Sequence, residues 1–178
     1  MNNRTHKIGG VCLGMITSTV LFSNELTFEG LLSSGLIISG SLVGSLAPDI
    51  DHPESKVGRV PVLRPISLLI NKIFGHRTLT HSVVMSIIMF VLLLISTNMF
   101  GDGFFAFLYT NFIIGFCVGW TSHLLLDVIT IKGISLFYPF VKKKYNILKF
   151  RTSRDEDLVS TVTILLTGVL MVIYFRGN

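Results

Sequence analysis

The chain has 178 residues, of which 50% are hydrophobic and 14% charged, and its mean hydropathy is +0.69. An average soluble domain is roughly 25% charged, so this composition argues against a soluble domain and indicates several spanning helices in a single domain, residues 1–178. The formal net charge of +5 lies in segments that flank apolar stretches, where it suits anionic membrane lipid and does not indicate nucleic acid binding.

Five apolar segments predict an all-α, polytopic membrane protein with about five transmembrane helices. They cover 8–22, 30–47, 82–100, 104–126 and 158–175. The last three can cross a hydrocarbon core of ~30 Å, which needs about 20 residues. The first two are short, although helices of about 17 residues can still span. Close packing of these two segments is expected from their glycines, namely Gly9, Gly10, Gly14, Gly35, Gly40 and Gly44.

Two polar connections join these segments on the same side. The first, 48–81, contains an amphipathic stretch over 62–74. Its apolar residues recur at helical spacing, which predicts an interfacial helix that does not span the membrane. The second, 132–157, carries aromatic residues around Pro139 and then three lysines. We expect an interfacial loop with aromatic anchors there.

The distribution of Lys and Arg predicts the orientation. With five spans, one side receives fourteen of the fifteen basic residues and the other side receives only Arg176. The positive-inside rule therefore places the N-terminus and both long connections in the cytoplasm, in a multi-pass protein of the inner or plasma membrane. The same side receives every histidine and three aspartates: His6, His52, His76, His81, His123, Asp49, Asp51 and Asp127.

Two of the motifs on this side combine carboxylates with imidazoles. His123-Leu-Leu-Leu-Asp127 places both groups on one helical face, so both could reach one metal ion, although a plain hydrogen bond at a helix end is the alternative. Pro48 ends the second apolar segment and is followed by Asp49, Asp51 and His52, which could also be an ordinary Asp-rich turn. Such ligands suit zinc, with manganese or iron as alternatives, rather than copper(I).

A third motif, GHRTLTHS at 75–82, adds His76, Arg77 and His81. The two histidines are too far apart for one ideal helical face, so they converge only if a loop or cap separates them. Arg77 could bind a phosphate group, because its planar donors match phosphate oxygens. His6 is either a further ligand or merely a solvated or capping group near a helix start.

The motifs THKIG, PDIDHPES, GHRTLTHS and SHLLLDVITIKGISLFYPF occur in an order that resembles the YdjM family, described as LexA-regulated, membrane-bound, metal-dependent hydrolases. The resemblance covers residues 5–140 and implies a reaction class but no substrate. The motif positions that the resemblance implies are His6, Asp49, Asp51, His52, His76, Arg77, His81, His123 and Asp127. Thr130, Gly133 and Pro139 accompany them.

The leading prediction is hydrolysis by one or two divalent ions, zinc first, that activate water. Metal ligands are expected among His6, Asp51, His76, His81, His123 and Asp127. Asp49 and His52 are expected to act as general base, further ligands or orienting groups, and Arg77 to bind an anionic group of the substrate. A site at headgroup depth suggests an amphipathic substrate, either a phospholipid or a lipid-linked phosphate or ester.

Two other functions stay open. In a cation transporter, His and Asp would line a path through the membrane, but the opposite halves of the helices carry no matching charges. In a non-catalytic membrane module, the metal would join helix ends while the basic segment 142–154 recruits anionic lipid or another protein. The sequence predicts no particular oligomeric state.

Overall fold

The computed structural model describes residues 1–22, 27–152 and 154–177. Its helices are α1 (Asn3–Phe22), α2 (Phe28–Gly44), α3 (Arg64–Phe74), α4 (Val83–Thr97), α5 (Phe104–Val128) and α6 (Glu156–Gly177), with the 3-10 helices η1 (Ala47–Asp51) and η2 (Asn98–Phe100). Within the described residues, β structure is limited to two isolated bridges, Thr130 with Phe150 and Ile134 with Tyr145. The prediction of an all-α protein is confirmed.

Four segments of the described chain are long and apolar enough to cross a membrane: Phe28–Asp51, Val83–Phe100, Phe104–Val128 and Glu156–Arg176. They correspond to four of the five predicted spans. The remaining one is α1, which has 20 residues but includes Arg4 and Lys7 in its first turns and is not among the four. The predicted number of five spans is therefore approximate.

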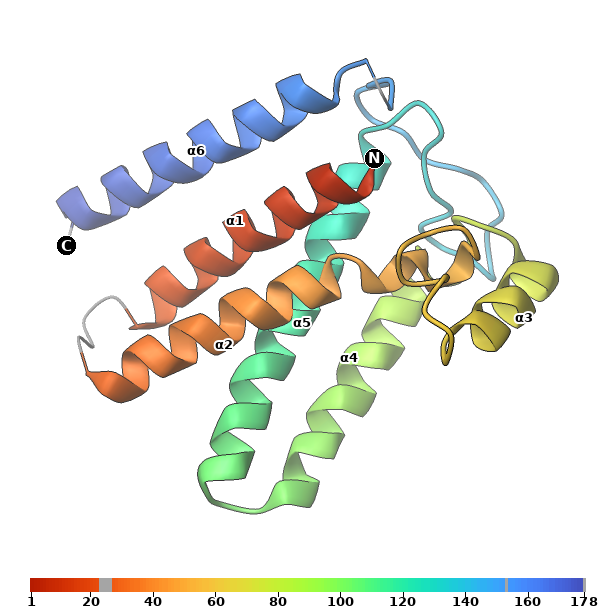
Figure 1. The fold of residues 1–178 in the computed structure, drawn as a ribbon. Helices are drawn as coiled ribbons and strands as arrows, with labels where there is room; N and C mark the ends of the chain where they lie inside the picture. The colour runs from red at the N-terminus through yellow and green to blue at the C-terminus, as the bar shows by residue number, and fades with distance from the viewer. Residues whose placement is uncertain (23–26, 153, 178) are drawn as a thin grey trace.

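The helices converge at one end of the molecule (Figure 1). α1 packs against both α2 and α6, α5 crosses α2, and α4 packs against α5. In Figure 1, α6, α1 and α2 lie side by side, while the α4–α5 pair extends in a different direction. The starts of α1, α4 and α6 meet the ends of α2 and α5, and we call this region the polar end.

α2 and α5 cross with their backbones in contact. The crossing contains two pairs of glycines, each pair four residues apart: Gly40 and Gly44, Gly115 and Gly119. A Cβ at any of them would overlap backbone atoms of the other helix, as at Gly44, which faces the carbonyl of Phe116. Such small-residue pairs allow close helix packing in membranes. The crossing fixes the end of α2 against the last turns of α5.

α1 also packs closely on α2. Gly10 and Gly14 lie against Ser41, whose hydroxyl donates to the carbonyl of Gly10 at 2.7 Å. Gly35, which was expected to contribute to close packing, has open space around its Cα and does not take part. The prediction of close packing therefore holds for the contact between α1 and α2, and these contacts bring the first turns of α1 to the polar end.

The two long connections cover the polar end. The amphipathic stretch forms α3, and its exposed apolar residues include Ile66, Leu69 and Ile73. Asn71 ties α3 to η1 by donating to the backbone carbonyl of Asp51 at 2.7 Å. In the second connection, Gly133 has a left-handed φ of 58°, and a Cβ there would overlap the Tyr145 carbonyl, so glycine is required.

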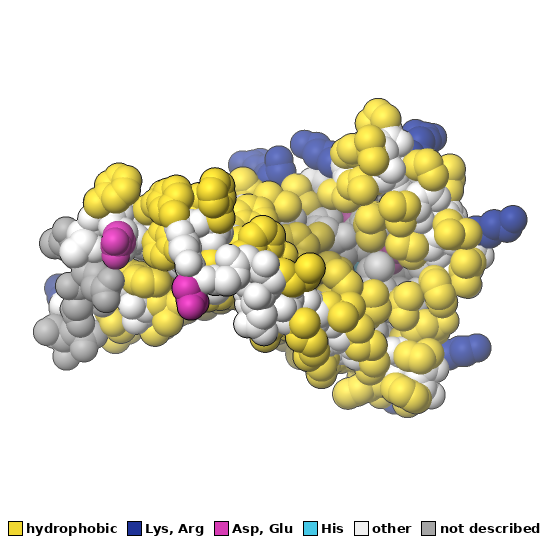
Figure 2. All heavy atoms as spheres, turned by 90° about the horizontal axis from the view of Figure 1, so that it is seen from below, with side chains coloured by type: hydrophobic (Ala, Val, Ile, Leu, Met, Phe, Trp, Pro, Cys, Tyr) yellow, Lys and Arg dark blue, Asp and Glu magenta, His cyan; other side chains and the backbone are white. Residues whose placement is uncertain are grey.

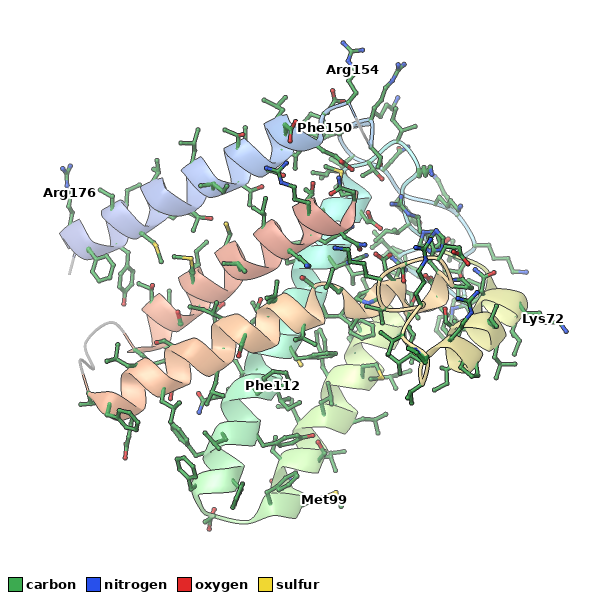
Figure 3. The ribbon with its side chains drawn as sticks, in the orientation of Figure 1. Lys72, Met99, Phe112, Phe150, Arg154 and Arg176 are labelled. Atoms are coloured by element: carbon green, nitrogen blue, oxygen red, sulfur yellow. The ribbon has the colours of Figure 1, made fainter. Side chains whose placement is uncertain are left out.

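Charge and apolar surface are separated along the molecule. Figure 2 shows a face covered mostly by apolar side chains, with Lys and Arg mainly along its top and right edges in this view. Figure 3 labels Lys72 and Arg154 at the polar end, whereas Arg176 lies at the opposite end beside the C-terminus. This distribution agrees with the grouping of basic residues on one side of the predicted spans.

Candidate metal centre

Residues from four parts of the chain form a buried cluster at the polar end. Pro48 lies in the first turn of η1, which carries Asp49 and Asp51. Ser82 caps the start of α4 by accepting a hydrogen bond from the Met85 amide at 3.1 Å. The remaining members come from the start of α1, the segment between α3 and α4, and the last turns of α5: His6, His76, Arg77, His81, His123 and Asp127. The cluster therefore forms only when all these elements are packed.

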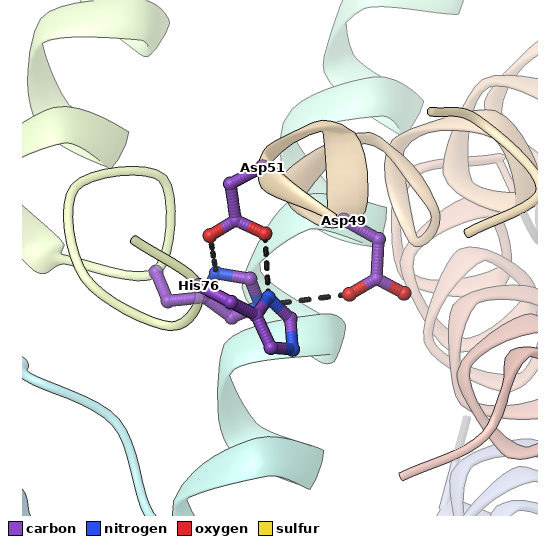
Figure 4. A group of neighbouring side chains, drawn as sticks. Asp49, Asp51 and His76 are labelled. Atoms are coloured by element: carbon purple, nitrogen blue, oxygen red, sulfur yellow. Dashed lines mark hydrogen bonds and ion pairs between the residues drawn. The ribbon is translucent and has the colours of Figure 1, made fainter. Parts of the chain in front are cut away.

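The carboxylate of Asp51 orients two histidines (Figure 4). Its Oδ1 lies 2.7 Å from Nδ1 of His76, and its Oδ2 lies 3.1 Å from Nδ1 of His81. Oδ2 also accepts from the Thr80 hydroxyl at 2.7 Å and from the Arg77 amide at 3.0 Å. Because a carboxylate only accepts, Nδ1 of each ring carries a hydrogen, which leaves Nε2 as the ring atom that could bind a metal ion. Asp51 orients His76 and His81 in this way, and it also lies within ligand distance of Asp49, His76 and His81, so its role as a ligand stays a prediction.

Three side-chain atoms converge behind this network. The distance from His81 Nε2 to His123 Nε2 is 3.0 Å, and Asp127 Oδ2 lies 3.4 Å from the first and 3.6 Å from the second. In a tetrahedral zinc site with bonds of ~2.0–2.1 Å, neighbouring ligand atoms are roughly 3.3 Å apart. Asp127 Oδ2 is buried and has no hydrogen-bond partner in the described chain. The triangle therefore fits three ligands of one small divalent cation.

The Nε2 atoms of His81 and His123, which face each other, require a positive charge between them. His123 Nδ1 lies 2.7 Å from the Ser45 carbonyl and must donate to it, so Nε2 of His123 also carries a lone pair. Burial lowers the pKa of His81, but the carboxylates of Asp127 and Asp51 outweigh burial and raise that pKa to about 9.

The second oxygen of Asp127 is held by cationic groups. Arg77 Nη2 donates to Oδ1 at 2.9 Å, and the amino group of Met1 donates to it at 2.6 Å. Arg77 Nη1 donates to the Thr130 hydroxyl at 3.1 Å, and this hydroxyl donates to the Asp127 carbonyl at 2.8 Å. Arg77 has a left-handed φ of 65°, which is strained for a residue other than glycine. Its guanidinium therefore positions Asp127, whereas contact with a substrate stays a prediction.

His6 lies at the closed side of the cluster. Its ring is fully buried and stacks on the ring of His123, with centroids 3.7 Å apart and an interplanar angle of 9°. Neither ring nitrogen has a hydrogen-bond partner among the described residues, and Nε2 lies 3.5 Å from Asp127 Oδ1. The alternative of a solvated or capping histidine is wrong for His6, because its ring is inaccessible to water.

The open side of the cluster faces η1. Asp49 is 14% exposed, and its Oδ1 lies 3.7 Å from His123 Nε2 and 3.8 Å from His81 Nε2. His76 is 32% exposed. His52 is more exposed, accepts from the Glu54 amide at Nδ1, and has its ring centroid 4.8 Å from that of His76. Of the nine predicted site residues, His52 alone lies at the rim of the connected cluster rather than within it.

Some contributors were not predicted. The carbonyl of Ser45 and the hydroxyl of Thr80 act through the fold and leave no pattern in the sequence. Gly115 and Gly119, by contrast, form a small-xxx-small pattern inside an apolar helix, which is a recognisable packing signal. This signal would have predicted that the end of α5 packs closely against another helix.

The chain is similar to a family of inner membrane proteins and to proteins of two bacteria. A family model described as YdjM inner membrane protein matches residues 1–177. The uncharacterized protein YvsG of Bacillus subtilis is 34% identical over 180 residues, covering 100% of this chain and 99% of that protein. The inner membrane protein YdjM of Escherichia coli is 35% identical over 103 residues, covering 58% of this chain and 49% of that protein. No solved structure matches the chain.

Proposed function

The chain belongs to the YdjM inner membrane protein family, and we propose that it is a membrane-embedded, metal-dependent hydrolase whose active site lies at the cytoplasmic ends of its helices. The family and the apolar helices support a location in the membrane. The observation that carries the proposal is the convergence of His81, His123 and Asp127, whose ligand atoms lie close enough together to bind one ion. Three protein ligands and one open position are typical of catalytic zinc sites.

The residues of the chain can prepare such a site for hydrolysis. A divalent cation, zinc first with manganese or iron as alternatives, would lower the pKa of a bound water and polarise an oxygen of the substrate. Asp51 and the Ser45 carbonyl fix the tautomers of His81 and His123. Asp49 lies beside both histidines and is partly exposed, so it is placed to accept a proton as general base.

The position of the site suggests the class of substrate. The more exposed members, Asp49, His76 and His52, open at the polar end, beside α3 and its exposed apolar residues. The basic residues gather at the same end (Figure 3). An amphipathic, anionic molecule in the headgroup layer would reach this opening without leaving the membrane. A phospholipid or a lipid-linked phosphate or ester therefore suits the site best.

Lipid hydrolysis gives the direct test of the proposal. Wild-type protein in nanodiscs is incubated with phosphatidic acid, phosphatidylglycerol and a polyprenyl phosphate, and the release of phosphate and of fatty acid is measured. We expect product release from one of these lipids. A chelator is expected to abolish this release, and His81→Ala to reduce it at least about 100-fold, as for loss of a catalytic metal. The matched control is Asn146→Ala, at an exposed position away from the cluster.

A purely structural metal is the second candidate, because the cluster joins the starts of α1 and α4 to the C-terminal ends of α2 and α5. Metal binding would then contribute directly to folding. If the wild-type protein holds stoichiometric metal but hydrolyses none of the lipids, and if a chelator unfolds it, the structural role replaces the catalytic one.

The proposed orientation makes a separate prediction. A reporter fused at Asn98, in the connection between α4 and α5, is expected on the outer side of the membrane, and one at Lys143 on the cytoplasmic side. Paired reporters that require opposite compartments would measure this. A cytoplasmic signal at Asn98 would contradict the orientation and move the cluster to the other face.

A further inference from the structure

The stacking of His6 on His123 limits what one metal ion can bind. The lone pairs of an imidazole lie in the plane of its ring, so a ligand binds an ion within that plane. The two rings are 3.7 Å apart and within 9° of parallel, so their planes do not meet at any nearby point. One ion therefore cannot be bound by both histidines with good geometry.

His6 nevertheless requires a partner. The ring is fully buried, and neither of its nitrogens has a hydrogen-bond partner among the described residues. A buried polar group without a partner destabilises the fold. Three overlapping sets of side chains lie within ligand distance: His6 with Asp49 and His123, His81 with His123 and Asp127, and His81 with Asp49, Asp51 and His76. The donor atoms thus exceed the coordination of one ion.

The carboxylate of Asp127 faces each ring with a different oxygen. Oδ2 lies 3.6 Å from His123 Nε2, and Oδ1 lies 3.5 Å from His6 Nε2. A carboxylate placed in this way can bridge two ions. In two-metal hydrolytic sites the ions lie about 3.5–4 Å apart, which is close to the separation of the stacked rings.

We propose that the cluster holds two divalent cations bridged by Asp127, one bound by His81 and His123 and the other by His6, with Asp49 beside both. This inference rests on the metal centre of the proposed function and sets its metal count. The second cation would replace the Met1 amino group at Oδ1 of Asp127, while Arg77 remains bonded to that oxygen and to Thr130.

Metal stoichiometry tests the proposal. Detergent-purified protein is stripped with chelator, reloaded with Zn²⁺, desalted and analysed for zinc per chain. Wild type is expected to retain two ions, His6→Ala one, and the control Asn146→Ala two, because Asn146 is exposed and lies outside the ligand sets. One ion in the wild type, or two in His6→Ala, would overturn the two-ion centre and leave the hydrolase proposal standing. No ion in the wild type would overturn both.

A second readout needs no variant. In wild-type protein loaded with Mn²⁺, two ions at this separation are expected to give an exchange-coupled electron paramagnetic resonance spectrum. Spectra recorded at one and at two equivalents of Mn²⁺ show whether the coupling appears only when the second ion binds. A spectrum of isolated Mn²⁺ at full loading would contradict the bridged pair even if His6→Ala does not fold.

Discussion

Replacement of Asp127 by alanine is expected to abolish metal binding and to lower the free energy of unfolding by about 3–5 kcal/mol. Asp127 is buried, and its Oδ1 is the partner of the buried guanidinium of Arg77 at 2.9 Å. Removal of one member of a buried ion pair leaves the other charge without compensation. Because Oδ2 belongs to the metal triangle, the same substitution removes one of the three ligands. Zinc content and thermal unfolding of the purified protein would measure both effects.

Asp157→Ala is the matched control for this prediction. Its carboxylate is 91% exposed and lies 3.5 Å from Arg4, itself an exposed side chain. Exposed ion pairs of this kind contribute little to stability. We expect unchanged zinc content and an unchanged melting temperature. If Asp127→Ala behaved like Asp157→Ala in both measurements, Asp127 would be neither a ligand nor the partner that Arg77 requires.

Gly119→Ala is expected to have the second large effect, a loss of about 1–3 kcal/mol or more of stability, because its Cβ would overlap the backbone of α2 at Ser41. The helices would have to move apart at the crossing, and His123, one turn further along α5, would lose its contact with the Ser45 carbonyl. The metal content is therefore expected to fall together with the stability. Unfolding by denaturing detergent, followed by circular dichroism, would measure the change.

Gly35→Ala provides the comparison on α2, because open space surrounds this position. Alanine also has a higher helix propensity than glycine, so this variant is expected to be as stable as the wild type or slightly more stable. An equal loss of stability in Gly35→Ala and Gly119→Ala would show that the crossing does not depend on direct contact between the two backbones.

Hydropathy predicted the apolar helices well but not their polar ends. α5 was expected over 104–126 and runs over Phe104–Val128, so its core was correctly placed. The first segment was expected to begin at residue 8, whereas α1 begins at Asn3. Thr5 and His6 are buried polar residues in the first turns of this helix, and a hydropathy pattern registers only apolar burial. The error therefore arose where a helix carries functional polar residues.

Residue types identified the members of the site, and the structure adds the contacts that each member makes. Asp51 and Asp127 were both expected as ligands, and each belongs to a possible ligand set. Asp51 is surrounded by donors, whereas Oδ2 of Asp127 has no hydrogen-bond partner among the described residues. Arg77 was expected to face a substrate, and the structure pairs it with Asp127. These assignments depend on which atoms face each other across segments far apart in the chain, and sequence spacing contains no information about that.

X-ray absorption at the zinc edge would test the central claim most directly. For wild-type protein loaded with Zn²⁺, we expect nitrogen and oxygen ligands at ~2.0–2.2 Å, with scattering from imidazole rings that decreases in His81→Ala and His123→Ala. Retained zinc without imidazole scattering, or scattering that neither substitution changes, would contradict a metal centre built on these two histidines.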